Sequence, residues 1–188
     1  MRRIAEVREA TNCEFNRRRG LRISFFQSDD EFAGWDVCDV LIQDTSDSIL
    51  EHLERNFSPN PLQAYIELWG IFQGLIIQQD SIAEMHKIIV GTMPDLSSAE
   101  NWKELRSLRH TCAGHPSKRT KGVSGTRRTL FSRSFGSYEK IWFQTYESEK
   151  GESILPTVNL RRLILGYDEE ASSFLSAVLF VMECRADT

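Results

Sequence analysis

The sequence predicts a mainly helical protein, a bundle of four to five helices with one small β-hairpin inserted before the last helix. Three observations lead to this prediction. Long segments repeat apolar residues at helical spacing, residues that favour helix ends stand at the borders of these segments, and one stretch rich in aromatic and β-branched residues surrounds a glycine. A chain of 188 residues is long enough for one domain with a sizeable core.

The N-terminal part of the chain carries the weakest pattern. Residues 1–28 lack a clear period, so we expect a loose arm there, with a short strand at 21–26. The single helical domain would then cover residues 29–188.

The first predicted helix begins at the acidic run 29–31, because carboxylates favour the positive end of a helix. Apolar residues follow at helical spacing, and the pattern ends before Pro59. The polar run 44–46 interrupts it and predicts a kink there. The contributing apolar residues are Val37, Val40, Leu41, Ile49, Leu50, Leu53 and Phe57.

The second predicted helix has the clearest signals. Asn60 suits the N-cap position and Pro61 the first helical position. The apolar pattern continues to Ile89, and Gly91 ends it. Its first apolar positions are Leu62, Tyr65, Trp69, Phe72 and Ile76.

The third predicted helix begins after Ser98 and ends around Gly114 and Pro116. A loop over 117–126 leads into the predicted hairpin insertion, about 128–146, which turns at Phe135-Gly136-Ser137. A long last helix follows Pro156. Its apolar stripe is formed by Leu160, Leu163, Ile164, Tyr167, Ala171, Phe174, Leu175, Val178, Leu179 and Met182.

Charge is unevenly distributed along the chain. The net charge is −4, yet residues 103–133 hold nine Lys or Arg and one acid, whereas residues 29–54 hold nine acids and no Lys or Arg. This excludes a uniformly basic nucleic-acid binder. The basic segment is either a local surface for a polyanion or a solvated loop.

The chain has no apolar run long enough to span a bilayer and no secretory signal pattern at its N-terminus. Its four cysteines are scattered and form no CxxC pair, which is typical of reduced thiols. These observations predict a cytoplasmic protein without a membrane partner.

The stretch RHTCAGHP, residues 109–116, holds an arginine, two histidines and a thiol at the end of the third helix. On a helical wheel Arg109 falls within the apolar stripe, where a permanent charge needs a partner. The partner would be an internal carboxylate, another subunit or an anionic ligand. Asp80, which also interrupts an apolar pattern, is the internal candidate. His115 falls at the stripe edge, where an imidazole also suits a helix C-terminus.

Arg109, the polar His110 and His115 resemble the Rx4-6H motif of HEPN domains (higher eukaryotes and prokaryotes nucleotide-binding). In that motif an arginine, often followed by a polar residue, precedes a histidine near a helix end. The position on the penultimate helix of a bundle agrees with the resemblance, which covers about 35–185. The hairpin has no place in the minimal HEPN bundle.

The resemblance implies a homodimer with two motifs in one cleft and, in many members, a metal-independent ribonuclease of toxin–antitoxin, defence or RNA-processing systems, with no cofactor. His115 would be the acid/base, Arg109 would stabilise the phosphate charge, and His110 would support the site. A histidine titrates near neutral pH and a guanidinium matches phosphate oxygens. Residues that would guide RNA are Lys118, Arg119, Lys121, Arg127 and Arg128.

Other functions remain open at this stage. The same bundle could be a non-catalytic dimeric module that binds a nucleotide or partners a nucleotidyltransferase-type antitoxin. His110, Cys112 and His115 give the spacing H-x-C-x2-H, but on a regular helix the two histidines point apart, which disfavours a metal site. Cys112 lies in the apolar stripe, where thiols are inert. The chain has no Walker A or GxGxxG pattern.

Overall fold

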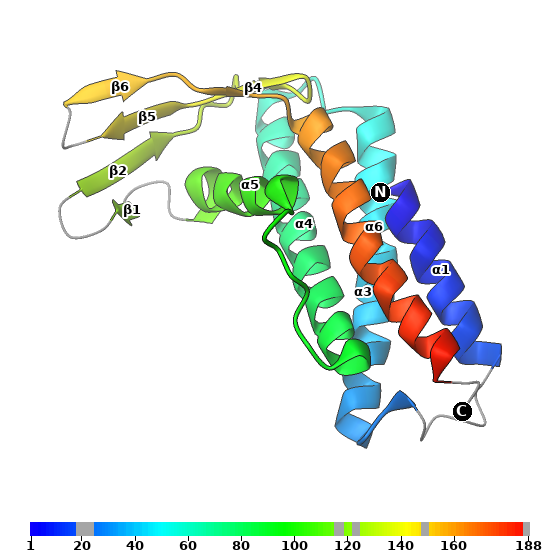
Figure 1. Ribbon diagram of the computed structural model, residues 1–188. Coiled ribbons are helices and arrows are strands. Elements are labelled where there is room, and N and C mark those ends of the chain that lie inside the picture. The colour runs from blue at the N-terminus through cyan, green and yellow to red at the C-terminus, as the bar shows by residue number, and fades with distance from the viewer. Residues whose placement is uncertain (18–24, 115–118, 122–124, 148–150, 186–188) are drawn as a thin grey trace.

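The computed structural model describes residues 1–17, 25–114, 119–121, 125–147 and 151–185, with side chains left undescribed at 119–121 and 125–127. The described chain is mainly helical (Figure 1). Four long helices run alongside one another, and a shorter helix, α5, lies across them. The helices are α1 (Arg2–Arg17), α3 (Asp29–Arg55), α4 (Pro61–Val90), α5 (Glu100–Arg109) and α6 (Leu160–Cys184).

The structure confirms the first two predicted helices, α3 and α4. Ser28 caps α3 by accepting a hydrogen bond from the Glu31 backbone N–H. Asn60 caps α4, and Gly91 ends it in the left-handed conformation. α3 runs as one helix through the polar run 44–46, where Gln78 of α4 donates hydrogen bonds to the hydroxyl groups of Thr45 and Ser46.

The expected loose arm is wrong for residues 2–17, which form α1 and pack against α3 and α6. Two polar contacts hold α1 in place. The Asp168 carboxylate accepts hydrogen bonds from the backbone N–H groups of Arg3 and Ile4, and buried Arg8 pairs with buried Asp39. Most of the strand expected at 21–26 lies outside the described residues, and Phe25 and Phe26 are buried without belonging to a strand.

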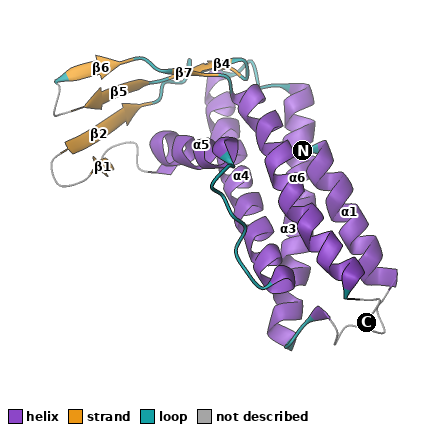
Figure 2. Cartoon of the chain, viewed as in Figure 1, coloured by secondary structure: helices purple, strands orange, loops and turns teal. Residues whose placement is uncertain are grey.

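The expected single hairpin at 128–146 is wrong: the described residues between 119 and 158 form seven short strands in two antiparallel sheets (Figure 2). The four-stranded sheet has the order β1-β2-β5-β6 and the three-stranded sheet the order β3-β4-β7. The pairing of β2 with β5 matches the two expected arms in part. The strands are β1 (Arg119–Lys121), β2 (Gly125–Leu130), β3 (Gly136–Ser137), β4 (Lys140–Trp142), β5 (Gln144–Glu147), β6 (Glu152–Ile154) and β7 (Thr157–Val158).

The sheets and the helices share one hydrophobic core. Phe131, Phe135, Tyr138 and Phe143, from and around the short strands, are buried together with the apolar faces of the helices. This segment therefore packs as part of the domain. No helix among the described residues is long and apolar enough to cross a membrane.

Candidate functional site

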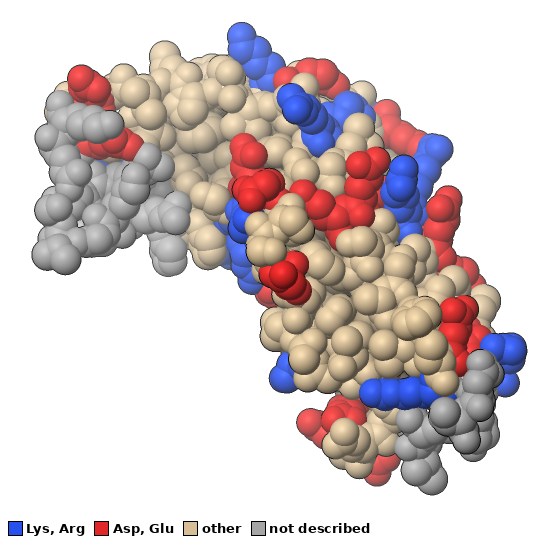
Figure 3. Space-filling model, in the orientation of Figure 1, with Lys and Arg blue, Asp and Glu red and all other residues tan. Residues whose placement is uncertain are grey.

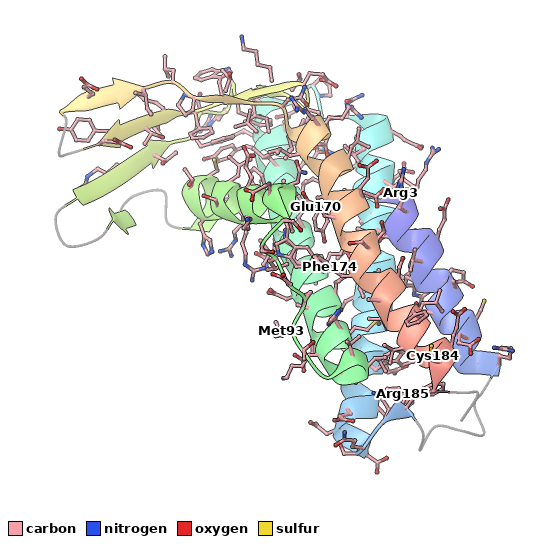
Figure 4. The ribbon with its side chains drawn as sticks, in the orientation of Figure 1. Arg3, Met93, Glu170, Phe174, Cys184 and Arg185 are labelled. Atoms are coloured by element: carbon pink, nitrogen blue, oxygen red, sulfur yellow. The ribbon has the colours of Figure 1, made fainter. Side chains whose placement is uncertain are left out.

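The α5 helix, which carries Arg109, is positioned by α6. α5 has no N-terminal cap of its own, because Ala99 stands at that position. Glu170 of α6 takes this role: its carboxylate accepts hydrogen bonds from the backbone N–H groups of Asn101 and Trp102 and from the Asn101 side chain (Figure 4). The helices approach so closely that a methyl group at Gly166 would lie 2.5 Å from Asn101 Nδ2.

Two arginines of α5 reach α4. Arg106 donates to Gln79 Oε1 at 3.1 Å and pairs with Asp80 Oδ1 at 2.5 Å. Arg109, one turn later, is half-buried and donates to Gln73 Oε1 at 3.1 Å. The expected Arg109–Asp80 pair is therefore wrong: the carboxylate meets Arg106, and Arg109 meets a neutral amide.

The end of this helix departs from regular α-helical geometry. Residues His110–Gly114 form a π-helical turn, η2, in which five residues fill the turn. A methyl group at Gly114 would lie 3.1 Å from Arg109 Nη1 and 3.4 Å from His110 Nδ1. Arg109 and His110 thus gather around Gly114. His115, the next residue in the sequence, lies outside the described residues.

The π-turn keeps Cys112 in the core, where it is 1% exposed. Burial raises the pKa of the Cys112 thiol to about 12, so the nucleophilic thiolate is scarce near neutral pH. Among the described residues, no cluster of His, Cys, Asp and Glu could hold a metal ion. The H-x-C-x2-H pattern itself includes His115 and is untested.

The residues expected to guide RNA are placed only in part. Lys118 lies outside the described residues, and the backbones of Arg119, Lys121 and Arg127 belong to β1 and β2. Arg128 pairs across strands with Tyr146, which is 42% exposed.

The sheet separates Arg128 from α5. The next cross-strand pair, Thr129 with Thr145, occupies the opposite face. Thr145 lines a cavity together with Ser107 and Thr111 of the α5–η2 segment, so that face looks toward α5. The structure therefore does not bring Arg128 to Arg109.

An exposed apolar surface on α4 leads to Arg109. Leu62, Ile66 and Trp69, called the α4 stripe below, are 53%, 68% and 42% exposed. They lie on one side of the helix, and Gln73 continues that line one turn beyond Trp69. Leu62 and Trp69 belong to the apolar pattern that predicted this helix, and the structure leaves both of them exposed.

Charged side chains mark no broad basic face in the view of Figure 3. Lys and Arg are interspersed with Asp and Glu over the described helices. No protein-family model, curated protein or solved structure matches the chain. A proposal for the function therefore rests on the geometry around Arg109.

Proposed function

We propose that the protein is a metal-independent ribonuclease of the HEPN type, acting in a toxin, defence or RNA-processing role. The observation that carries the proposal is the guanidinium of the half-buried residue Arg109, which donates to a neutral amide in an exposed contact and lies beside His110 and Gly114. Gln73 brings no negative charge, and no carboxylate among the described residues forms an ion pair with Arg109, so its charge is available to an anionic ligand. The sequence places a second histidine, His115, immediately after Gly114.

The proposed reaction needs no cofactor. The imidazole of His115 takes the proton of a ribose 2′-hydroxyl, whose oxygen attacks the adjacent phosphorus. The bond from phosphorus to the 5′-oxygen breaks, and that oxygen takes up a proton from water, while the protonated His115 later returns its proton to the solvent. Arg109 stabilises the extra charge on the phosphate oxygens, and His110 supports the site. The products are a 2′,3′-cyclic phosphate and a 5′-hydroxyl end.

Substrate would be drawn in by the basic segment after η2. Lys118, Arg119, Lys121 and Arg127 follow the motif closely in sequence, and cations there attract an RNA backbone through a sequence-independent field. Arg128 and Tyr146, neighbours across β2 and β5, offer a guanidinium and an aromatic ring to an RNA strand. Since these two lie on the sheet face away from α5, they would contact RNA outside the reaction centre.

Self-association is the second part of the proposal. The α4 stripe is apolar, exposed and continuous with Gln73, which holds Arg109. Pairing of two chains along this stripe would bury Trp69 and bring the two Arg109 side chains into one cleft. A cytoplasmic antitoxin that blocks the activity would bind the α4 stripe in place of the second chain.

The α4 stripe also favours a second function, a non-catalytic dimeric module that binds a nucleotide or partners a nucleotidyltransferase-type antitoxin. In that case Arg109 would bind an anion without chemistry.

RNA cleavage by the purified protein tests the first proposal. We expect the wild type to cleave single-stranded RNA in the presence of EDTA and to leave 2′,3′-cyclic phosphate ends. Arg109→Ala and His115→Ala should each lower the rate by at least about a hundredfold, because an acid/base group or an oxyanion-stabilising group contributes on that order.

Lys103→Ala is the matched control, since it removes one exposed cation from the same helix without touching Arg109. Circular dichroism would check that every variant is folded. Cleavage that persists equally in all variants would contradict the assignment of these residues. RNA binding without cleavage by the wild type would favour the non-catalytic module.

A further inference from the structure

A second site lies at the end of the bundle where α3 finishes and α4 and α6 begin. A cavity of about 570 Å³ opens there, within the usual size range of small-molecule sites. Its walls come from the α3–α4 connection, the turn 133–139 and Arg161 of α6. No residue of α5 lines it, so the cavity is distinct from the Arg109 site.

Arg161 is a structural wall of this cavity rather than a ligand-binding group. Its guanidinium donates to Glu139 Oε1 at 2.8 Å, twice to the Leu53 carbonyl oxygen at 3.3 Å, and to Asn56 Oδ1 at 3.0 Å. A guanidinium has five N–H donors, so these four contacts leave at most one for a ligand.

Glu139 balances the charge of Arg161. Hydrogen bonds from Arg161 and from the Ser137 hydroxyl lower the pKa of the Glu139 carboxyl group, so it stays ionised near neutral pH. The Arg161–Glu139 pair therefore contributes no net charge to the cavity.

Arg133 supplies the unbalanced positive charge. It lines the cavity and is exposed, and no carboxylate among the described residues forms an ion pair with it. A free guanidinium at the mouth of a cavity matches a phosphate or carboxylate group in shape and charge.

The inner wall is aromatic. The Phe57 and Tyr138 rings stack with centroids 4.4 Å apart, and Phe135 meets Phe57 edge-on at 5.1 Å. His52 holds Tyr138 in place through a hydrogen bond, because its Nδ1 lies 2.7 Å from the Tyr138 hydroxyl oxygen. Phe57 is half-buried, so it is the ring of this group that a ligand can reach.

The rim is held in an uncommon backbone conformation. Asn56 has φ 65° and ψ −179°, which costs a non-glycine residue energy and persists only where the surroundings hold it. Arg161 provides that support through the Asn56 side chain. This part of the cavity wall therefore has its conformation before a ligand binds.

We propose that this cavity binds a small organic anion that carries a planar ring, with a phosphate or carboxylate group on Arg133 and the ring against Phe57. The inference is independent of the ribonuclease proposal, because none of its residues belongs to the motif.

Phenyl phosphate is the probe, with inorganic phosphate and benzyl alcohol as its two halves. Calorimetry and ¹H–¹⁵N NMR would follow binding. Phenyl phosphate should bind more tightly than either half, with shifts centred on Ser134–Ser137. Arg133→Gln should weaken it by at least about tenfold, as loss of a charge-assisted contact does. Phe57→Leu should weaken phenyl phosphate but not inorganic phosphate.

Lys140→Gln is the matched control, since it removes an exposed cation from the same segment without lining the cavity. It should bind phenyl phosphate as the wild type does, while Arg133→Lys should fall between wild type and Arg133→Gln. Equal affinities of wild type and Arg133→Gln would overturn the proposal. So would shifts outside the cavity, or no binding at ten millimolar phenyl phosphate.

Discussion

His52 shows how one buried side chain makes the stability of this fold depend on pH. It is 8% exposed at the end of α3, and its Nε2 lies 3.3 Å from the Glu67 carboxylate. Burial lowers the pKa of His52; the hydrogen bond and charge of Glu67 oppose this shift, and Arg55 adds to it. The folded protein therefore keeps His52 neutral at pH values where the unfolded chain already binds a proton.

This linkage predicts the sign of a pH effect. The folded state has its full stability, as far as His52 is concerned, above the pKa of this residue in the unfolded chain, about 6.5. As the pH falls from there toward the lowered pKa of the folded state, the unfolded chain binds the proton first and the free energy of unfolding decreases. Urea unfolding at pH 7.5 and 5.5 should show a lower free energy of unfolding at pH 5.5. His52→Gln should reduce that difference. If His52→Gln loses as much free energy of unfolding between pH 7.5 and 5.5 as the wild type does, other titrating groups cause the pH effect.

Arg109 shows what the sequence can and cannot predict about a single residue. Its place within an apolar stripe predicted a carboxylate, another subunit or an anionic ligand as its partner, whereas the structure places the neutral amide of Gln73 there. The partner itself was missed, because Asp80 and Gln73 lie about two turns apart on α4 and both face α5. Which of them meets Arg109 depends on where the two helices cross, and that follows from packing rather than from either helix alone.

Among the elements, α5 depends most on a neighbour. Glu170→Gln keeps the size of the side chain and removes the charge that caps α5, so we expect a loss of about 1–2 kcal/mol in the free energy of unfolding. Faster hydrogen exchange at Asn101 and Trp102 should accompany it.

Glu169→Gln is the control for this change. Glu169 is the adjacent carboxylate, it is exposed, and it pairs with Arg3 at 3.4 Å. It should alter stability by less than about 0.5 kcal/mol. Equal effects of the two variants would mean that the Glu170 cap adds nothing beyond a surface charge.

The sequence predicted elements well where local signals agree. α4 combines an N-cap, a proline at its start and a glycine at its end, and its bounds were nearly correct. α1 was missed because its stability is not local: its buried face includes charged Arg8, whose buried partner, Asp39, is distant in the sequence. The short strands were merged into one hairpin, because their division into two sheets depends on contacts with the helices.

The α4 stripe makes a prediction about the whole molecule. If two chains pair there, Ile66→Glu should shift the protein from dimer to monomer in analytical ultracentrifugation, because it places two charges in an apolar contact. Phe180→Glu is the control, as Phe180 is 64% exposed on α6, away from the stripe. If the wild type is a monomer, two chains do not pair and no shared cleft forms. If Phe180→Glu dissociates the dimer and Ile66→Glu does not, the two chains contact each other through α6 rather than through the α4 stripe.

The cap that Glu170 gives to α5 also sets an order of events during synthesis. A helix of ten residues is marginal by itself in water, and its capping carboxylate is made 69 residues after Asn101. Until Glu170 has left the ribosome, the nascent chain therefore lacks the group that anchors α5 and, with it, Arg109. If the chain is the ribonuclease proposed above, its Arg109 site would stay unanchored until α6 has been made and has docked.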